Sequence, residues 1–124
     1  MQTLELYVPM LPPTINHCYK VNRWGGRRLS KDGVDFKRIV AFKIKADGVK
    51  FAGSDKLSLE MELHSPKWLT KKGLIARADV SNLIKISEDA LMEALGLDDK
   101  NVFELRVLKV PSPKSMIIYR LKNV

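Results

Sequence analysis

The sequence predicts an α/β (α+β) protein in which two helices accompany a mixed sheet of about four strands. Four segments have the hydrophobicity pattern of strands and two have helical spacing, in the order β-α-β-α-β-β along the chain. The 124 residues contain no internal repeat and no long linker. This predicts a single domain over residues 1–124.

The first strand is predicted at residues 3–8, where three apolar side chains alternate with polar or aromatic ones. Prolines at positions 9, 12 and 13 end it, and residues 14–29 follow as a long basic loop. Ser30 is the expected N-cap of a helix that runs to about Ala46. The apolar face of this helix comprises Phe36, Ile39, Val40 and Ile44.

The second strand is predicted at residues 56–65, which alternate leucine or methionine with polar side chains. A second basic loop leads to a helix from about Ser81 to Leu95, which Gly96 terminates. Strands at residues 102–110 and 116–122 complete the chain. Because only a short Pro- and Ser-rich turn separates them, we expect these last two strands to form a hairpin.

The chain is basic, with 22 Lys and Arg against 14 Asp and Glu and a net charge of +8. Such a balance favours a polyanionic partner, either nucleic acid or an anionic membrane surface. No segment approaches the roughly 20 apolar residues of a membrane span, and residues 1–10 lack the basic start of a signal peptide. With a single cysteine, Cys18, the sequence predicts a cytoplasmic protein without membrane contact.

The polar residues between positions 77 and 102 form the pattern that carries chemistry. Asp79 precedes the second predicted helix, and Asp98-Asp99 follow it. The polar side chains that share one face of the helix are Asn82, Lys85, Asp89 and Glu93. Phosphodiester hydrolysis commonly uses Mg²⁺, which takes oxygen ligands such as these carboxylates.

The same pattern also has a purely structural interpretation. A polar helix face is usually a solvated face. Asp79 or Ser81 can be an ordinary N-cap, and Asp98-Asp99 an ordinary turn. Spacing alone therefore leaves the metal site and the solvated face both open.

The order of these residues resembles the core of the RusA family of Holliday-junction resolvases, which reads D-x-D-N-L-x-K, an Asp four residues later, a Gly, and D-D-x-x-V. The matching residues here are Asp79, Asn82, Lys85, Asp89, Gly96, Asp98, Asp99 and Val102. Near the N-terminus, Pro13, Asn16 and Tyr19 match the family's P-x-x-N-x-x-Y. Each piece is weak, but together they run in order over nearly the whole chain.

The resemblance implies metal-binding or catalytic roles for Asp79 and Asp99, and a catalytic or phosphate-contacting role for Lys85. Asp89 and Asn82 match further positions of the motif, and we keep Asp89 as a catalytic candidate. The implied activity is a structure-selective endonuclease that resolves Holliday junctions by paired nicks in DNA recombination and repair. The implied cofactor is Mg²⁺, with Mn²⁺ as the alternative, and no small-molecule cofactor is expected. Relatives of this kind are often carried by phages and prophages.

Ser81 departs from the family pattern, which often has a second aspartate at this position. A serine hydroxyl is a neutral and weaker ligand for Mg²⁺. Ser81 can act through a water, or Asp89 can supply the missing charge. The departure leaves Ser81 a candidate metal ligand beside Asp79 and Asp99, but it places the metal affinity in doubt.

The spacing of the two aspartates suggests a dimer. A straight helix from Ser81 to Leu95 is roughly 22 Å long at ~1.5 Å per residue, too far for one metal to bridge Asp79 and Asp99. Either the flanking loops fold back, or the aspartates meet across a two-fold interface. We hypothesise composite sites in a homodimer, which suits the two-fold symmetry of a four-way junction.

Two basic loops are the candidate contacts to DNA phosphates. The DNA-binding candidates are Asn16, Lys20, Arg23, Arg27, Arg28, Lys67, Lys71, Lys72, Arg77 and Asn82. Trp24 and Trp68 lie in these loops and either stack on unpaired bases or pack against the protein. His17 and Cys18 have no second pair at zinc spacing, so we expect no structural zinc.

Three alternatives to the resolvase interpretation remain. The first is a non-catalytic dimer that binds branched DNA through a weakened metal site, and Ser81 favours it. The second is a nuclease of the same fold that acts on flaps or replication forks. The third is a basic interaction module, whose binding would be independent of divalent metal and of branch structure.

Overall fold

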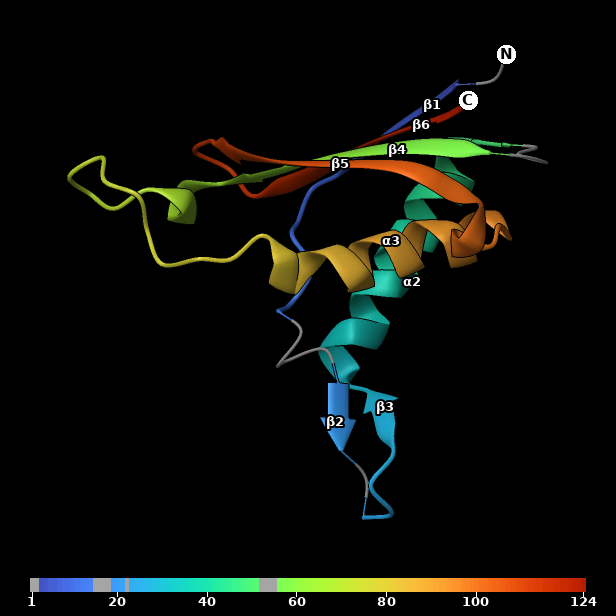
Figure 1. Ribbon diagram of the computed structural model, residues 1–124, viewed down its shortest axis with the longest axis horizontal. Coiled ribbons are helices and arrows are strands. Elements are labelled where there is room, and N and C mark those ends of the chain that lie inside the picture. Colours follow the sequence, from blue (N-terminus) through green and yellow to red (C-terminus); the bar gives the residue numbers. More distant parts are fainter. Residues whose placement is uncertain (1–2, 15–18, 22, 52–55) are drawn as a thin grey trace.

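The computed structural model describes residues 3–14, 19–21, 23–51 and 56–124. Within them, two α-helices cover one face of a four-stranded mixed sheet, and the other face is open (Figure 1). This confirms the predicted combination of sheet and helices. The elements in chain order are β1 (Thr3–Val8), β2 (Tyr19–Val21), β3 (Arg27–Leu29), α2 (Lys31–Ala46), β4 (Leu57–Ser65), η1 (Pro66–Trp68), α3 (Ser81–Leu95), η2 (Asp99–Asn101), β5 (Val102–Pro111) and β6 (Met116–Asn123).

The strand order of the main sheet is β1-β6-β4-β5. β4 and β5 are parallel, while β6 runs antiparallel to both β1 and β4. The predicted hairpin of the last two strands is therefore wrong, because β4 lies between them. Residues 112–115 carry the chain across the end of β4, where the Ser112 N–H donates to the Ser65 carbonyl at 3.2 Å. The buried apolar side chains of β6, among them Ile117, Tyr119 and Leu121, suit a strand that is paired along both of its edges.

The core lies between the sheet and the two helices. Alternate residues of β1, β4 and β6 point inward, including Leu6, Met61 and Tyr119, all fully buried. They pack in one hydrophobic cluster with apolar residues of both helices, among them Phe36 and Leu91. The buried Tyr119 hydroxyl donates to the Ser87 carbonyl at 2.7 Å, which fixes α3 against β6.

The helix α2 begins as predicted, with the Ser30 side chain accepting from the Gly33 N–H at 3.2 Å. Its buried residues are Gly33, Phe36, Val40 and Ile44. Ile39, which we expected on this face, is 37% exposed. The buried stripe follows positions i, i+3, i+7 and i+11 from Gly33, and Ile39 lies at its margin.

The segment predicted as one long basic loop contains a short antiparallel hairpin of β2 and β3, which projects from the body beyond the start of α2 (Figure 1). No strand was predicted here because neither strand has more than three residues, which is too short for an alternating pattern to be recognised. None of the helices in the described part of the chain has the length and apolar character needed to cross a membrane.

Candidate functional site

The helix α3 begins without a side-chain cap. Its N-cap residue is Val80, which forms no side-chain capping hydrogen bond, and the first turn contains no acidic residue. The capping interpretation of Asp79 and Ser81 is therefore wrong. The first N–H groups of a helix carry partial positive charge, so this end of α3 favours an anion.

A pocket of about 600 Å³ lies at this end of α3. Two basic side chains, Lys67 and Arg77, line it together with Asp79 and Asn82. Asp79 and Arg77 are exposed to solvent, and Asn82 is half-buried. The pocket thus combines cations, an uncapped helix end and one carboxylate, an arrangement suited to a phosphate group approached by a metal or a water.

Trp68 forms part of the pocket wall and fixes the second basic loop to the sheet. Its ring is only 5% exposed, and its Nε1–H donates to the Leu63 carbonyl at 2.6 Å. The Lys109 ammonium lies 5.1 Å from the ring centroid and also donates to the Ala78 carbonyl. Of the two alternatives for Trp68, the structure confirms packing against the protein.

Lys85 is the centre of a second group of polar side chains, farther along α3. Its Nζ lies 3.1 Å from Asp89 Oδ1 and 3.3 Å from Asp99 Oδ2. Asp98, in contrast, caps η2, because its side chain accepts from the Lys100 N–H at 3.0 Å. The two adjacent aspartates therefore differ in role: Asp98 stabilises the turn, and Asp99 faces the helix.

Glu88 joins this group, although the sequence pattern did not single it out. Carboxylate oxygens of Glu88, Asp89 and Asp99 all lie within 4.8 Å of one another, so these three side chains can hold a metal ion together. Burial raises the pKa of Glu88, and the nearby charge of Asp99 raises it further. Helical spacing could have identified it from the sequence, because Glu88 is three residues after Lys85 and therefore near it on the helix.

Lys85 remains the cation of this group. The hydrogen bond that Lys85 donates to Asp89 is the main reason that the pKa of Lys85 is raised, and its hydrogen bond to Asp99 contributes in the same direction. A lysine with a raised pKa is protonated at neutral pH. It can therefore supply positive charge or a proton to a phosphate, but it is unsuited to act as a base.

The structure divides the predicted site residues into two places. Lys85, Asp89 and Asp99 come together, while Asp79 and Asn82 line the pocket at the start of α3. The exposed Ser81 belongs to the first turn of α3, about 6 Å from Lys85 along the axis at ~1.5 Å per residue. The loop after α3 folds back onto the helix, since Asp99 Oδ2 lies 3.3 Å from Lys85 Nζ. The composite arrangement of Asp79 and Asp99 stays a prediction.

The other predicted DNA contacts lie on two projecting segments. Lys71 and Lys72 are exposed in the turn that Gly73 closes, and this turn extends far from the sheet (Figure 1). Lys20, Arg23 and Arg28 are exposed on the β2–β3 hairpin. Asn16, the His17-Cys18 pair and the side chains of Tyr19 and Arg27 lie outside the described residues.

Comparison with known proteins gives one family. The family described as endodeoxyribonuclease RusA matches residues 10–120, which includes every residue of the two groups on α3. No curated protein matches the sequence.

Proposed function

The chain belongs to the RusA endodeoxyribonuclease family, and from this premise we propose that it is a metal-dependent endonuclease that resolves four-way DNA junctions by paired nicks. The observation that carries the proposal is the group formed by Lys85 with Asp89 and Asp99, at 3.1 and 3.3 Å. The two carboxylates can bind a metal, and the ammonium of Lys85 can contact a phosphate. Phosphodiester hydrolysis requires both functions at one place.

The carboxylate group fits a hard divalent cation. Mg²⁺ prefers oxygen ligands and is commonly bound by one or two carboxylates plus waters. Glu88, Asp89 and Asp99 offer more negative charge than Lys85 can neutralise, and the raised pKa of Glu88 reflects this excess together with burial. When bound, Mg²⁺ would activate water and offset the charge that develops on the phosphate. We propose Mg²⁺ as the physiological ion, with Mn²⁺ as a substitute.

Lys85 is proposed to contact the phosphate that is cut. Its side chain is more than half exposed, and its Nζ already contacts both aspartates. An ammonium in this position stabilises negative charge on the non-bridging oxygens or donates a proton to the leaving oxygen. Asp89 and Asp99 hold the ammonium in place, so they act on the phosphate through Lys85 as well as on the metal.

The pocket at the start of α3 is proposed to hold the DNA strand next to the cut. Lys67 and Arg77 provide charge for the backbone, and Asn82 provides an amide toward the sugar or base. Asp79 lines the pocket just before α3, and we propose that it and Ser81 complete the metal environment once DNA is bound. Exposed Lys71 and Lys72 extend the contact along the duplex.

A homodimer is proposed, because two symmetric nicks require two sites related by a two-fold axis. Asp99 contacts Lys85, whereas Asp79 lines the pocket at the start of α3, so two arrangements are compared: a complete site within each chain, and sites shared across the two-fold axis. Mixing Asp79→Asn chains with Asp99→Asn chains tests this. A complete site within each chain leaves the mixed dimer inactive, whereas recovery of nicking would show that the sites are shared.

The function is tested by incubating the purified chain with a labelled four-way junction, with and without Mg²⁺. Linear duplex, flap and fork substrates are included to define structure selectivity. We expect paired nicks that require metal and disappear in Asp99→Asn. Asp98→Asn is the matched control, because asparagine also caps well and Asp98 does not contact Lys85.

Ser81 supports one second candidate, a dimer that binds branched DNA without cutting it. It predicts tight junction binding that is the same with and without metal, and no nicks in Mg²⁺ or Mn²⁺. The same incubation therefore separates the two candidates, and cutting confined to flaps or forks would indicate a different branched substrate.

A further inference from the structure

The two tryptophans of the chain lie in opposite environments. Trp68 is 5% exposed, whereas Trp24 is 84% exposed in the turn of the β2–β3 hairpin. Burial of a large aromatic surface is the usual reason for a tryptophan in a small protein. That reason accounts for Trp68 but not for Trp24.

The hairpin that carries Trp24 is unusually charged for its size. Lys20 and Arg28 are directly opposite each other in its register, and both are exposed. Like charges at opposed positions destabilise a strand pair, and a two-stranded hairpin is marginal by itself. An anion bound across the pair would remove this repulsion, so the hairpin is better suited to a polyanion than to free solution.

Arg23 is adjacent to the exposed ring. Its guanidinium lies 5.3 Å from the centroid of the Trp24 ring, within the range of a cation–π contact. Gly25 has a φ of 80°, in the left-handed region, where glycine is favoured because it has no side chain to clash with the backbone. The turn therefore presents an aromatic face beside a cation, which is the combination used to hold an unpaired base and its phosphate.

We propose that the β2–β3 hairpin recognises the branch point of the DNA, with Trp24 stacked on an unpaired or unstacked base and Lys20 and Arg28 on the adjoining phosphates. This rests on the proposed function for the identity of the substrate. It adds a source of selectivity for branched over linear DNA, which phosphate contacts alone do not provide.

The second basic loop offers a useful contrast. Its exposed large apolar residues are Leu69, Leu74 and Ile75, at 38%, 63% and 85%. Aliphatic side chains have no π face and cannot stack on a base as an aromatic ring does. Recognition of an unpaired base is therefore assigned to the hairpin, and the second loop keeps the general phosphate contacts.

The test is equilibrium binding of the full chain, without divalent metal, to a four-way junction and to a linear duplex of equal length. Trp24→Ala is expected to weaken junction binding by about tenfold and duplex binding by less than about twofold, the difference expected for loss of one base–aromatic stack. Trp24→Phe retains an aromatic ring and should recover most of the affinity. Phe42→Ala is the matched control, since Phe42 is 72% exposed on α2.

Tryptophan emission provides a second readout. Stacking on a base should quench the emission of Trp24 when the junction binds, and Trp24→Phe should remove this quenching because the remaining Trp68 is buried. Equal losses on junction and duplex, or no loss from Trp24→Ala, would overturn the proposal. Because binding is measured without metal, a chain that cuts junctions but is insensitive to Trp24→Ala rejects this inference alone. A chain that never cuts but binds junctions through Trp24 rejects only the proposed nuclease.

Discussion

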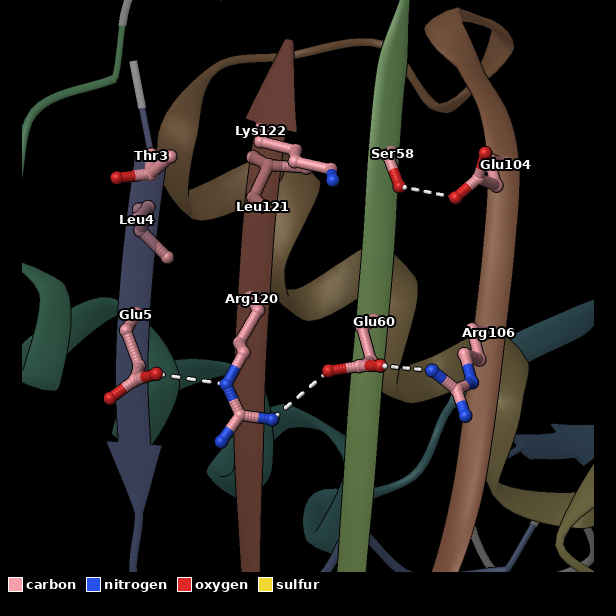
Figure 2. A pocket seen from close by; sticks show the side chains of 10 residues that line it. All are labelled: Thr3, Leu4, Glu5, Ser58, Glu60, Glu104, Arg106, Arg120, Leu121 and Lys122. Atoms are coloured by element: carbon pink, nitrogen blue, oxygen red, sulfur yellow. Dashed lines mark hydrogen bonds and ion pairs between the residues drawn. The ribbon is translucent and has the colours of Figure 1, made fainter. Parts of the chain in front are cut away.

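Two groups of acidic side chains in this molecule, one on the sheet and one on α3, differ in how their charge is balanced. On the open face of the sheet, Arg120 donates to Glu5 at 2.8 Å and to Glu60 at 3.0 Å, and Arg106 donates to Glu60 at 3.2 Å (Figure 2). Each carboxylate in this row has an arginine. On α3, three carboxylates share the single ammonium of Lys85.

The register of the sheet creates the first arrangement. Glu5 is opposite Arg120, Arg120 is opposite Glu60, and Glu60 is opposite Arg106, so one row of alternating charge crosses all four strands. Opposite charges at such cross-strand positions stabilise the pairing. The charged residues of this row, which line a hollow of about 370 Å³, are therefore accounted for by their stabilising role in the sheet.

The pKa shifts of the two groups have opposite directions. On the sheet, hydrogen bonds from Tyr7 and Arg120 lower the pKa of Glu5. On α3, burial and the neighbouring Asp99 raise the pKa of Glu88. A group of carboxylates that favours protons also favours another cation, so the difference supports placing the proposed metal on α3 rather than on the sheet.

The largest expected effect is the contrast between Asp99→Asn and Glu60→Gln. Each variant removes one carboxylate charge with little change of shape. Asp99→Asn should lower the rate of junction nicking by at least about 100-fold, the range for removing one group that stabilises charge in a transition state. Glu60→Gln should leave the rate unchanged, because Glu60 belongs to the balanced row.

Nicking rates at saturating DNA, together with the melting temperature of each variant, check this contrast. Asp99 is exposed, and its loss should leave the fold intact. If Glu60→Gln reduced nicking as much as Asp99→Asn, the open sheet face would have to belong to the catalytic surface.

The second expected effect concerns Glu88 and Mg²⁺. A raised carboxyl pKa means that the fold favours the protonated form, so without metal this group favours folding more as the pH falls through its pKa and less as the pH rises. Mg²⁺ at ten times its Kd should stabilise the wild type by about 1.4 kcal/mol, a rise in Tm of roughly 5 °C. Glu88→Gln should raise the Tm without metal and reduce the rise that Mg²⁺ produces.

Protons and Mg²⁺ compete for Glu88, which gives the experiment its pH dependence. The Mg²⁺-induced rise in Tm should shrink when the pH is lowered from neutral into the range above the ordinary glutamate pKa of about 4.3. In Glu88→Gln this pH dependence should be weaker. A Mg²⁺ response that is unchanged by the substitution would exclude Glu88 from the metal group.

The sequence predicted the elements of the fold better than their arrangement. Periodicity identified the four strands and two helices because each buries one face, and the Ser30 cap and the Gly96 stop fixed the helix ends. The pairing of β6 between β1 and β4 was missed, because a short turn predicts a hairpin unless long-range packing requires a crossover. The β2–β3 hairpin was missed because its strands bury no alternating face.

The candidate site was predicted by motif and corrected by geometry. Lys85, Asp89 and Asp99 matched a known spacing, and the structure brings them together. Spacing did not show that Asp98 is a cap while Asp99 faces α3, since adjacent residues look alike in sequence. Glu88 was missed because its role depends on the return of residues 98–101, which no local pattern encodes.

A smaller effect, on stability, is expected from Arg120→Ala on the sheet. It leaves Glu5, Glu60 and Glu62 facing one another without their shared cation, so the Tm at neutral pH should fall by a few degrees with no loss of nicking. The lowered pKa values of Glu5 and Glu62 contribute stability above the ordinary glutamate range, and this is lost as the pH falls through their values in the folded protein.

An acid titration of the Tm checks this sign. The wild type should lose stability below about pH 4.3 more steeply than Arg120→Ala, because Arg120 no longer lowers the pKa values of Glu5 and Glu62 in the variant. Parallel acid curves for the two proteins would show that the row contributes nothing to stability. Reduced nicking in Arg120→Ala at unchanged Tm would contradict the conclusion that the charged row on the sheet serves stability alone.

The smallest expected effect tests whether Ser81 limits the metal site. Ser81→Asp restores a carboxylate in the first turn of α3, which now has no acidic residue. A negative charge there interacts favourably with the helix dipole, by about 0.3–1 kcal/mol, so the fold should become slightly more stable. Nicking should reach half its maximum at a Mg²⁺ concentration a few fold lower, because Asp79 and the new aspartate attract the cation together.

Ser81→Asn adds a similar side chain without the charge and serves as the control. If Ser81→Asp instead weakened DNA binding and left the Mg²⁺ requirement unchanged, the uncapped end of α3 would bind a phosphate directly, and the metal would be confined to the group around Lys85.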